Sequence, residues 1–329
     1  MPRIDVESYE DDWEDAERAE TPRSRKLSVA ARKRIDDFDT ARVVAVDRGR
    51  VLVALEDRFV EAAFAGTMRG TKAAVGDRVR IRPRRHDTDV ARVVEVLPRS
   101  SALIRTGDDD SADERVVVAN ADLAVVVIAA DHLVAGTRLL DRVMVAASAG
   151  GLATAVCINK VDLVGDRAAV TDVLERYATL DVAGTATSAV TGEGIGSLEA
   201  LLGDRWSAFA GHSGVGKSSL YNRLIPEADQ VIGAMGRFGG RHTTVAARAL
   251  RVERLDAWLV DTPGVRSLGL GGVDARDLAR HFPELATLSC RLDDCVHDGE
   301  PGCTIAAAPI HPDRLASYRR LLAAVRARD

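Results

Sequence analysis

Cysteine is scarce in this sequence, and long apolar runs are absent from it. Only 4 of the 329 residues are cysteine, and three of these lie between positions 290 and 303, which argues against a secreted disulfide scaffold. The longest apolar run, 123–130, is far shorter than the ~20 residues that a membrane span needs. The amino terminus is acidic rather than signal-like. We therefore expect a soluble cytoplasmic protein without a membrane partner.

The chain also lacks a net positive charge, which argues mildly against nucleic acid as a partner. Its formal net charge is −5, but this sum hides regions of opposite sign. Residues 1–20 are dominated by Asp and Glu, whereas 21–34 carry basic residues and no acid. Because few of these side chains are apolar, we predict that 1–38 form a disordered charged tail. Its basic half could touch an RNA backbone or could simply be solvated.

Residues 39–99 are predicted to form the first of several domains, for which 329 residues provide enough chain. Short apolar segments alternate here with turn sequences such as 47–49 and 75–77, a spacing typical of a small β-barrel of the OB-fold kind. Thirteen basic residues stand against nine acidic ones, so the region is basic. Such a barrel commonly binds RNA, although only Phe59 and Phe64 offer stacking and a purely structural barrel is the alternative.

Residues 211–218 fit the phosphate-binding motif Gly-x-x-x-x-Gly-Lys-Ser. An apolar segment, 206–210, precedes the motif and a helical sequence follows it, which is the strand–loop–helix context of a P-loop. Its glycines let backbone N–H groups turn toward an anion at the positive end of the helix. Lys217 is predicted to neutralise the terminal phosphates, and the Ser218 hydroxyl to hold Mg²⁺. The alternative is a glycine-rich turn that matches by chance.

A second motif, Asn-Lys-x-Asp at 159–162, follows a buried strand sequence and is typical of guanine-specific proteins. Asp162 can accept two hydrogen bonds, from the N1–H and the exocyclic amine of guanine. We expect Asn159 to meet the base and to tie this loop to the P-loop, with the Lys160 stem lying over the ring. The segment 187–189 is placed to reach the guanine carbonyl through backbone N–H groups.

These motifs stand in an unusual order. In ordinary GTPases the P-loop comes first and the guanine motif last, but here 159–162 precede 211–218. The threonine pair within 241–244 and the Asp-x-x-Gly motif at 261–264 then follow the P-loop. This order predicts an α/β P-loop GTPase domain over 100–273 that has been circularly permuted, a change that folds tolerate when chain ends lie close together.

The permuted motifs make residues 39–329 similar to the RsgA (YjeQ/EngC) family of small ribosomal subunit biogenesis GTPases. The resemblance implies an OB-fold domain, a permuted GTPase domain and a carboxy-terminal zinc domain. It also implies a GTPase that is stimulated by the small ribosomal subunit and acts late in that subunit's maturation. The charged tail at 1–38 and the glycine-rich connector at 269–272 depart from the family pattern.

Three cysteines and a histidine near the carboxy terminus predict a zinc site. Cys290, Cys295, His297 and Cys303 are spaced Cys-x4-Cys-x-His-x5-Cys. Three thiolates and an imidazole satisfy a closed tetrahedral site, so the zinc would be structural. Reduced cysteines in a loop are the alternative. We assign 274–329 to a small zinc-binding α-helical domain.

The last helical sequence, 313–328, is rich in arginine and is predicted to present a phosphate-facing edge. The arginines of this predicted edge are Arg314, Arg319, Arg320, Arg326 and Arg328.

Hydrolysis needs a group that orients the attacking water. Many GTPases use a Gln directly after Asp-x-x-Gly, but Val265 stands there in this chain. His242 is the best candidate, because it adjoins the threonine pair and can both donate and accept a proton; it is also the residue that the resemblance to the family implies. A surface histidine is the alternative. Either Thr243 or Thr244 should complete the Mg²⁺ shell.

The sequence thus predicts a monomeric GTPase that binds GTP or GDP with Mg²⁺, holds one structural Zn²⁺ and has the small ribosomal subunit and its rRNA as partners. A GTP-gated ribosome-binding module with incidental hydrolysis is the main alternative, and a nucleotide kinase is a remote one because no acceptor-binding segment is evident. The predicted nucleotide contacts are Asn159, Lys160, Asp162, Ser188, Ala189, Gly211, Ser213, Gly214, Val215, Gly216, Lys217, Ser218, Ser219, Asp261 and Gly264.

Overall fold

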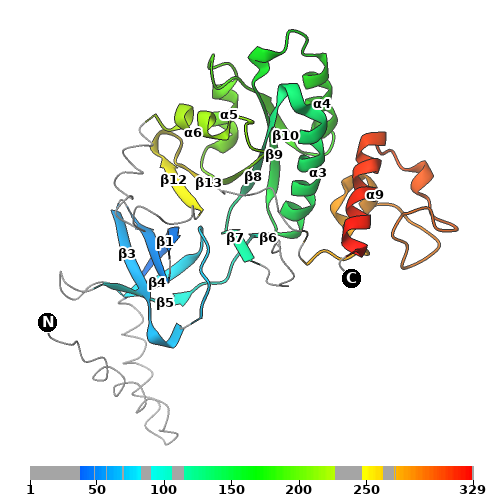
Figure 1. Cartoon of the computed structure of the whole chain (residues 1–329). Coiled ribbons are helices and arrows are strands. Elements are labelled where there is room, and N and C mark those ends of the chain that lie inside the picture. Colours follow the sequence, from blue (N-terminus) through cyan, green and yellow to red (C-terminus); the bar gives the residue numbers. More distant parts are fainter. Residues whose placement is uncertain are drawn as a thin grey trace, which may run out of the picture. The chain divides into compact units, whose positions relative to one another are not determined.

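The computed structural model describes residues 38–47, 49–56, 58–68, 70–82, 90–105, 115–226, 247–261, 270 and 272–327 (Figure 1). Apart from Phe38, the predicted tail at 1–38 lies outside these residues. Within the described residues, no helix is long and apolar enough to cross a membrane.

The first five strands form a closed barrel. Their order is β1-β2-β3-β5-β4, and an additional pairing of β1 with β4 completes the circle. β3 and β5 run parallel, whereas β1–β2, β2–β3 and β4–β5 are antiparallel. Alternate residues such as Val51, Val53, Val79 and Val93 point into the barrel and are fully buried. The predicted OB-fold barrel is thereby confirmed. The strands are β1 Asp39–Asp47, β2 Arg50–Leu55, β3 Arg58–Phe64, β4 Arg78–Arg82 and β5 Ala91–Val96.

A parallel sheet forms the centre of the α/β region. Its order is β10-β9-β8-β11-β13, and β12 is added antiparallel to β13 and also pairs with β1 of the barrel. β8 is buried along its whole length, as expected for a continuous apolar run in the middle of a parallel sheet. The strands are β8 Leu123–Ala129, β9 Ala153–Asn159, β10 Ala183–Ala186, β11 Trp206–Ala210, β12 Arg248–Val252 and β13 Ala257–Asp261; β6 Ala102–Arg105 and β7 Arg115–Ala119 pair separately.

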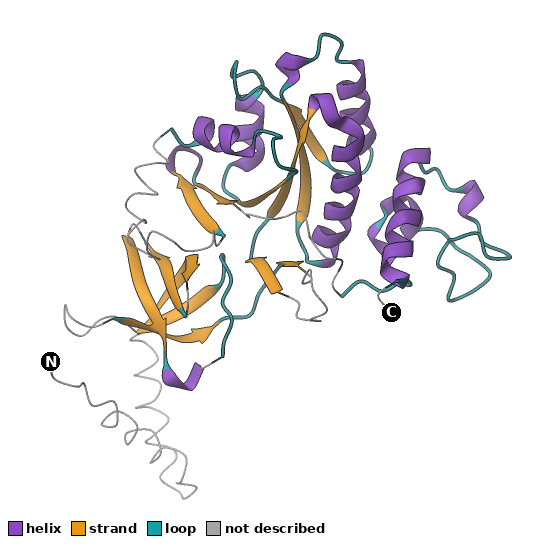
Figure 2. Cartoon of the chain, in the orientation of Figure 1, coloured by secondary structure: helices purple, strands orange, loops and turns teal. Residues whose placement is uncertain are grey.

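Helices lie on both sides of these parallel strands (Figure 2). α3 follows β8 and buries Leu139, Leu140 and Val143. Gly136 lets α3 approach β8 closely, because a Cβ at this position would lie 2.1 Å from the side chain of Ile128. The helices of this region are α3 Leu133–Ala149, α4 Ala168–Ala178, α5 Ile195–Leu202 and α6 Lys217–Leu224.

The carboxy-terminal region is built around a second, smaller hydrophobic core. Phe282 contacts Tyr318 edge-to-face, with ring centroids 5.1 Å apart, and Leu321 is buried beside them. Val145 of α3 belongs to the same cluster, so this core is continuous with the α/β region. Its elements are the 3₁₀ helices η7 Leu278–His281 and η8 Ile305–Ala307, and the helices α8 Pro283–Ala286 and α9 Pro312–Arg326.

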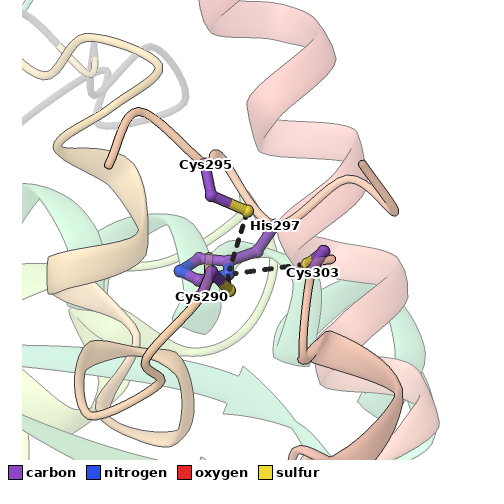
Figure 3. A group of neighbouring side chains, drawn as sticks. All are labelled: Cys290, Cys295, His297 and Cys303. Carbon is purple, nitrogen blue, oxygen red and sulfur yellow. Dashed lines mark hydrogen bonds between the residues drawn. The ribbon is translucent and has the colours of Figure 1, made fainter. Parts of the chain in front are cut away.

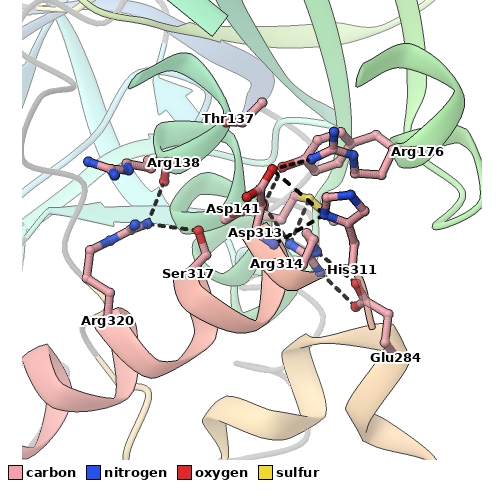
Figure 4. A network of polar contacts seen from close by, with 12 residues as sticks. Thr137, Arg138, Asp141, Arg176, Glu284, His311, Asp313, Arg314, Ser317 and Arg320 are labelled. Atoms are coloured by element: carbon pink, nitrogen blue, oxygen red, sulfur yellow. Dashed lines mark hydrogen bonds and ion pairs between the residues drawn. The ribbon is translucent and has the colours of Figure 1, made fainter. Parts of the chain in front are cut away.

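The burial of Arg314 contradicts the prediction that this residue belongs to a phosphate-facing edge of α9. Its side chain is 1% exposed and donates hydrogen bonds to Asp141 of α3 at 2.7 Å and to both carboxylate oxygens of Glu284 at 2.8 Å (Figure 4). Asp141 also accepts a bond from the Tyr177 hydroxyl at 2.6 Å. The prediction was therefore wrong for Arg314, because two buried carboxylates hold its guanidinium inside the protein.

The other arginines of this predicted edge differ among themselves. Arg319, Arg320 and Arg326 are all exposed, and Arg326 also forms an ion pair with Asp298 at 2.7 Å. Arg328 lies outside the described residues.

Candidate nucleotide and zinc sites

The P-loop motif forms a tight turn between β11 and α6. Gly214 and Gly216 have φ values of +82° and +94°, a region that favours glycine. A Cβ on Gly216 would lie 2.3 Å from the Asn159 amide nitrogen, and one on Gly211 would lie 2.6 Å from the Val127 carbonyl oxygen. The glycines are therefore needed both for the turn and for its close contact with the neighbouring segments.

Lys217 begins α6 and folds back over the loop. Its Nζ donates to the carbonyl oxygens of Gly211 at 2.7 Å and His212 at 2.9 Å. Ser218 and Ser219 are exposed in the first turn of the helix, and Ser213 is exposed in the loop. The loop thus places an ammonium group and exposed hydroxyls at a helix amino terminus, which is a favourable arrangement for phosphate.

Asn159 connects three segments through one buried amide. Its Nδ2 donates to the Val215 carbonyl at 2.9 Å, and its Oδ1 accepts from the Ala189 N–H at 3.1 Å and the Thr187 hydroxyl at 3.3 Å. Asn159 is 1% exposed, so these bonds satisfy a group that would otherwise be costly to bury. The predicted link between the 159–162 motif and the P-loop is present in the structure.

The two charged residues of the guanine motif are accessible to a ligand, Asp162 being exposed and Lys160 partly exposed, whereas Val161 is buried. Lys160 has a φ of +64°, and Asp162 is exposed in the 3₁₀ helix η4 Val161–Leu163 that follows it. Arg167 and Glu193 form an ion pair nearby, and the negative charge of Asp162 acts on both. This ion pair is not evident from the sequence, because its two members lie 26 positions apart in the chain.

The backbone N–H groups at 188–189 already have partners within the protein. Ser188 donates to the Glu193 carbonyl at 3.0 Å, and Ala189 donates to the Asn159 side chain. A contact between this segment and the guanine carbonyl therefore requires one of these bonds to be shared or exchanged, and it stays a prediction.

Asp261 ends β13 beside the P-loop. In the parallel pairing of β11 with β13, Asp261 is in register with Phe209. Burial raises the pKa of Asp261, and the positive charge of Lys217 partly offsets this shift. The predicted site residues His242, Thr243, Thr244 and Gly264 lie outside the described residues.

The four predicted zinc ligands lie together in the carboxy-terminal region (Figure 3). Their ligand atoms are all within 4.8 Å of one another, and the His297 Nδ1 lies 3.4, 3.7 and 3.8 Å from the sulfur atoms of Cys290, Cys295 and Cys303. Ligands bound tetrahedrally to Zn²⁺ would be about 3.6 Å apart, given metal–ligand bonds of about 2.0 to 2.3 Å. The side chains therefore fit one Zn²⁺ ion.

The surroundings of the four ligands act differently on the individual thiols. The Thr304 N–H donates to the Cys290 sulfur at 3.4 Å, and the Ile305 N–H donates to the Cys303 sulfur at 3.5 Å. The hydroxyl and N–H of Thr304 lower the pKa of Cys290. Burial instead raises the pKa of Cys295 to about 12. Because zinc binds thiolates, the surroundings favour the metal-binding form at Cys290, whereas Cys295 must lose its proton as the metal binds.

Comparison with known proteins gives concordant matches. Residues 96–271 match the family model described as RsgA GTPase. A small ribosomal subunit biogenesis GTPase RsgA of Gemmatimonas aurantiaca is 38% identical over 278 residues, covering 78% of this chain and 89% of the relative. The protein of the same name from Pseudomonas fluorescens is 38% identical over 246 residues, covering 71% of this chain and 70% of its own.

Two solved structures share the architecture. The crystal structure of YjeQ from Thermotoga maritima matches with a TM-score of 0.71 and 28% identity, covering 89% of this chain and 100% of that one. The structure of YloQ, described as a circularly permuted GTPase, matches with a TM-score of 0.69 over 89% of this chain and 96% of its own. At 23% identity, the second likeness shows the fold alone.

Proposed function

This chain belongs to the RsgA GTPase family, and from that premise we propose that it binds the small ribosomal subunit and hydrolyses GTP to GDP and phosphate while assisting the late maturation of that subunit. The observation that carries the GTP-binding part of this proposal is the buried amide of Asn159, which joins a guanine motif to a phosphate loop that follows it in the chain. Such a link makes one continuous site from the two motifs.

The binding roles follow from the positions of the side chains. Asp162 is exposed at the guanine end and accepts two hydrogen bonds from the base. Lys217 leaves the loop carbonyls for the phosphates, a stronger partner for an ammonium group. The Ser218 hydroxyl and the Asp261 carboxylate would hold Mg²⁺. Bound Mg²⁺ supplies neutralisation of the phosphate charge.

We assign the orientation of the attacking water to His242 and the last Mg²⁺ ligand to Thr243 or Thr244. Val265 cannot hydrogen-bond a water, so the function that a Gln has in other GTPases needs another side chain. His242 adjoins the threonine pair and can perform it.

The flanking regions provide contacts with the subunit. We propose domains at 39–99, 100–273 and 274–329, in which the basic barrel meets rRNA and the zinc site stabilises the carboxy-terminal region. We further propose a monomer that acts in the cytoplasm, where ribosomal subunits mature.

Nucleotide competition and co-sedimentation test the proposal. A fluorescent GTP analogue bound to the purified protein should be displaced by GTP and GDP and not by ATP. The protein should also sediment with small ribosomal subunits more strongly in its GTP-bound than in its GDP-bound form, and not with large subunits. Displacement by ATP at equal concentrations, or equal sedimentation with both subunits, would contradict it.

A further inference from the structure

The Tyr221 hydroxyl is a buried polar group that has no role in the proposed nucleotide site. Tyr221 lies one turn after Lys217 on α6 and is 6% exposed. Its hydroxyl oxygen has no hydrogen-bond partner within the part of the chain that the structure describes. Buried hydroxyls nearly always have a partner, because leaving one unsatisfied is costly. An orphaned hydroxyl at a ligand site therefore suggests that its partner forms when the ligand binds.

The position of the ring places this hydroxyl near Asp261. The Tyr221 ring packs on Phe209, with centroids 5.0 Å apart. Phe209 is in register with Asp261 on the neighbouring parallel strand, so the two side chains project from the same face of the sheet. Burial raises the pKa of Tyr221, and the negative charge of Asp261 raises it further. The hydroxyl therefore keeps its proton at neutral pH and remains a donor.

We propose that Tyr221 is a positioning residue whose hydroxyl donates a hydrogen bond to the Asp261 carboxylate when GTP and Mg²⁺ are bound. In the structure described here, the positive charge near Asp261 comes from Lys217, whose Nζ lies on the loop carbonyls. Once phosphates draw this ammonium group away, the half-buried carboxylate needs another donor. Tyr221 would supply that donor to one carboxylate oxygen and leave the other oxygen available to hold Mg²⁺. This inference rests on the proposed function.

The variant Tyr221→Phe tests the proposal, because it keeps the ring and removes only the hydroxyl. Two effects of opposite sign are expected. The nucleotide-free variant should melt at a higher temperature than the parent, because an unsatisfied buried group is gone. The Mg²⁺ concentration that gives half-maximal binding of a fluorescent GTP analogue should rise about tenfold, because a hydrogen bond to a charged group is lost.

Tyr177→Phe is the matched control. The Tyr177 hydroxyl is also buried, but it donates to Asp141 at 2.6 Å. Loss of the Tyr177 hydroxyl should lower the melting temperature and leave unchanged the Mg²⁺ midpoint, that is, the Mg²⁺ concentration that gives half-maximal binding of the GTP analogue. A parent protein without Mg²⁺-dependent GTP binding would overturn the proposed function and this inference together. A parent that binds normally, with Tyr221→Phe showing the same Mg²⁺ midpoint or a lower melting temperature, would overturn the inference alone.

Discussion

The variant Arg314→Met should loosen α9 from the α/β region. Methionine keeps an unbranched side chain of similar length but removes the guanidinium that bridges Asp141 and Glu284. Both carboxylates are buried, with side-chain exposures of 3% and 8%, so their charges would be left inside the protein without their cation. Breaking a buried ion pair from one side typically costs about 3 to 5 kcal/mol.

For Arg314→Met we expect a loss of stability near the lower end of that range, about 3 kcal/mol. Asp141 keeps one donor after the substitution, because the Tyr177 hydroxyl still bonds to it. The Arg314 guanidinium also lies 4.5 Å from the centre of the Phe282 ring, a contact that the methionine thioether can partly replace. A loss of about 3 kcal/mol corresponds to a roughly 100-fold larger equilibrium constant for opening of the structure that protects the α9 amides, and amide exchange speeds up in proportion when reclosing is fast.

Hydrogen exchange measured by mass spectrometry provides the assay. Peptides from α9 should exchange about 100-fold faster in Arg314→Met, while peptides from β9 in the same sample should be unchanged. Arg320→Met is the control on the same helix, because the exposed Arg320 side chain bonds only to the Arg138 carbonyl and the Ser317 hydroxyl among the contacts described for it. Equal α9 exchange in the two variants would refute the assignment of Arg314 as the anchor.

Three further predictions concern the nucleotide and zinc sites. Asp162→Asn should weaken GTP binding and favour xanthine nucleotides, whose 2-oxo group suits an amide donor; unchanged GTP affinity in a competition assay would remove Asp162 from the guanine contact. Protein purified without chelator should contain one zinc per chain by elemental analysis, and removing that zinc should disorder the segment around Cys295 while leaving GTP affinity largely intact. His242→Ala should lower subunit-stimulated turnover by ~10²-fold with little change in GTP affinity, and comparable turnover would assign water orientation to another group.

Local patterns in the sequence were sufficient to predict the main elements of the fold. The apolar run at 123–130 forms the buried strand β8. In the barrel, the turn sequence at 47–49 separates β1 from β2, and the turn sequence at 75–77 precedes β4. The zinc ligands were predictable for the same reason, since Cys290 and Cys303 lie close in the chain as well as in space. These features depend on residues that are near neighbours in sequence.

The burial of Arg314 could not be predicted in this way. Arginine on a terminal helix normally indicates an exposed face, and its partner Asp141 is 173 positions away. The orphaned hydroxyl of Tyr221 was equally hidden, because only the pairing of β11 with β13 brings Asp261 to the same face. In both cases the missing information is a long-range contact, which periodicity and motif spacing do not contain.

Turnover of GTP with and without purified small ribosomal subunits tests the central claim most directly. The rate of phosphate release by the protein should be slow alone, should rise as small subunits are added and should saturate with them, while large subunits at the same concentration have no effect. An equal rate with and without small subunits would contradict the account and would favour a GTP-gated binding module whose hydrolysis is incidental.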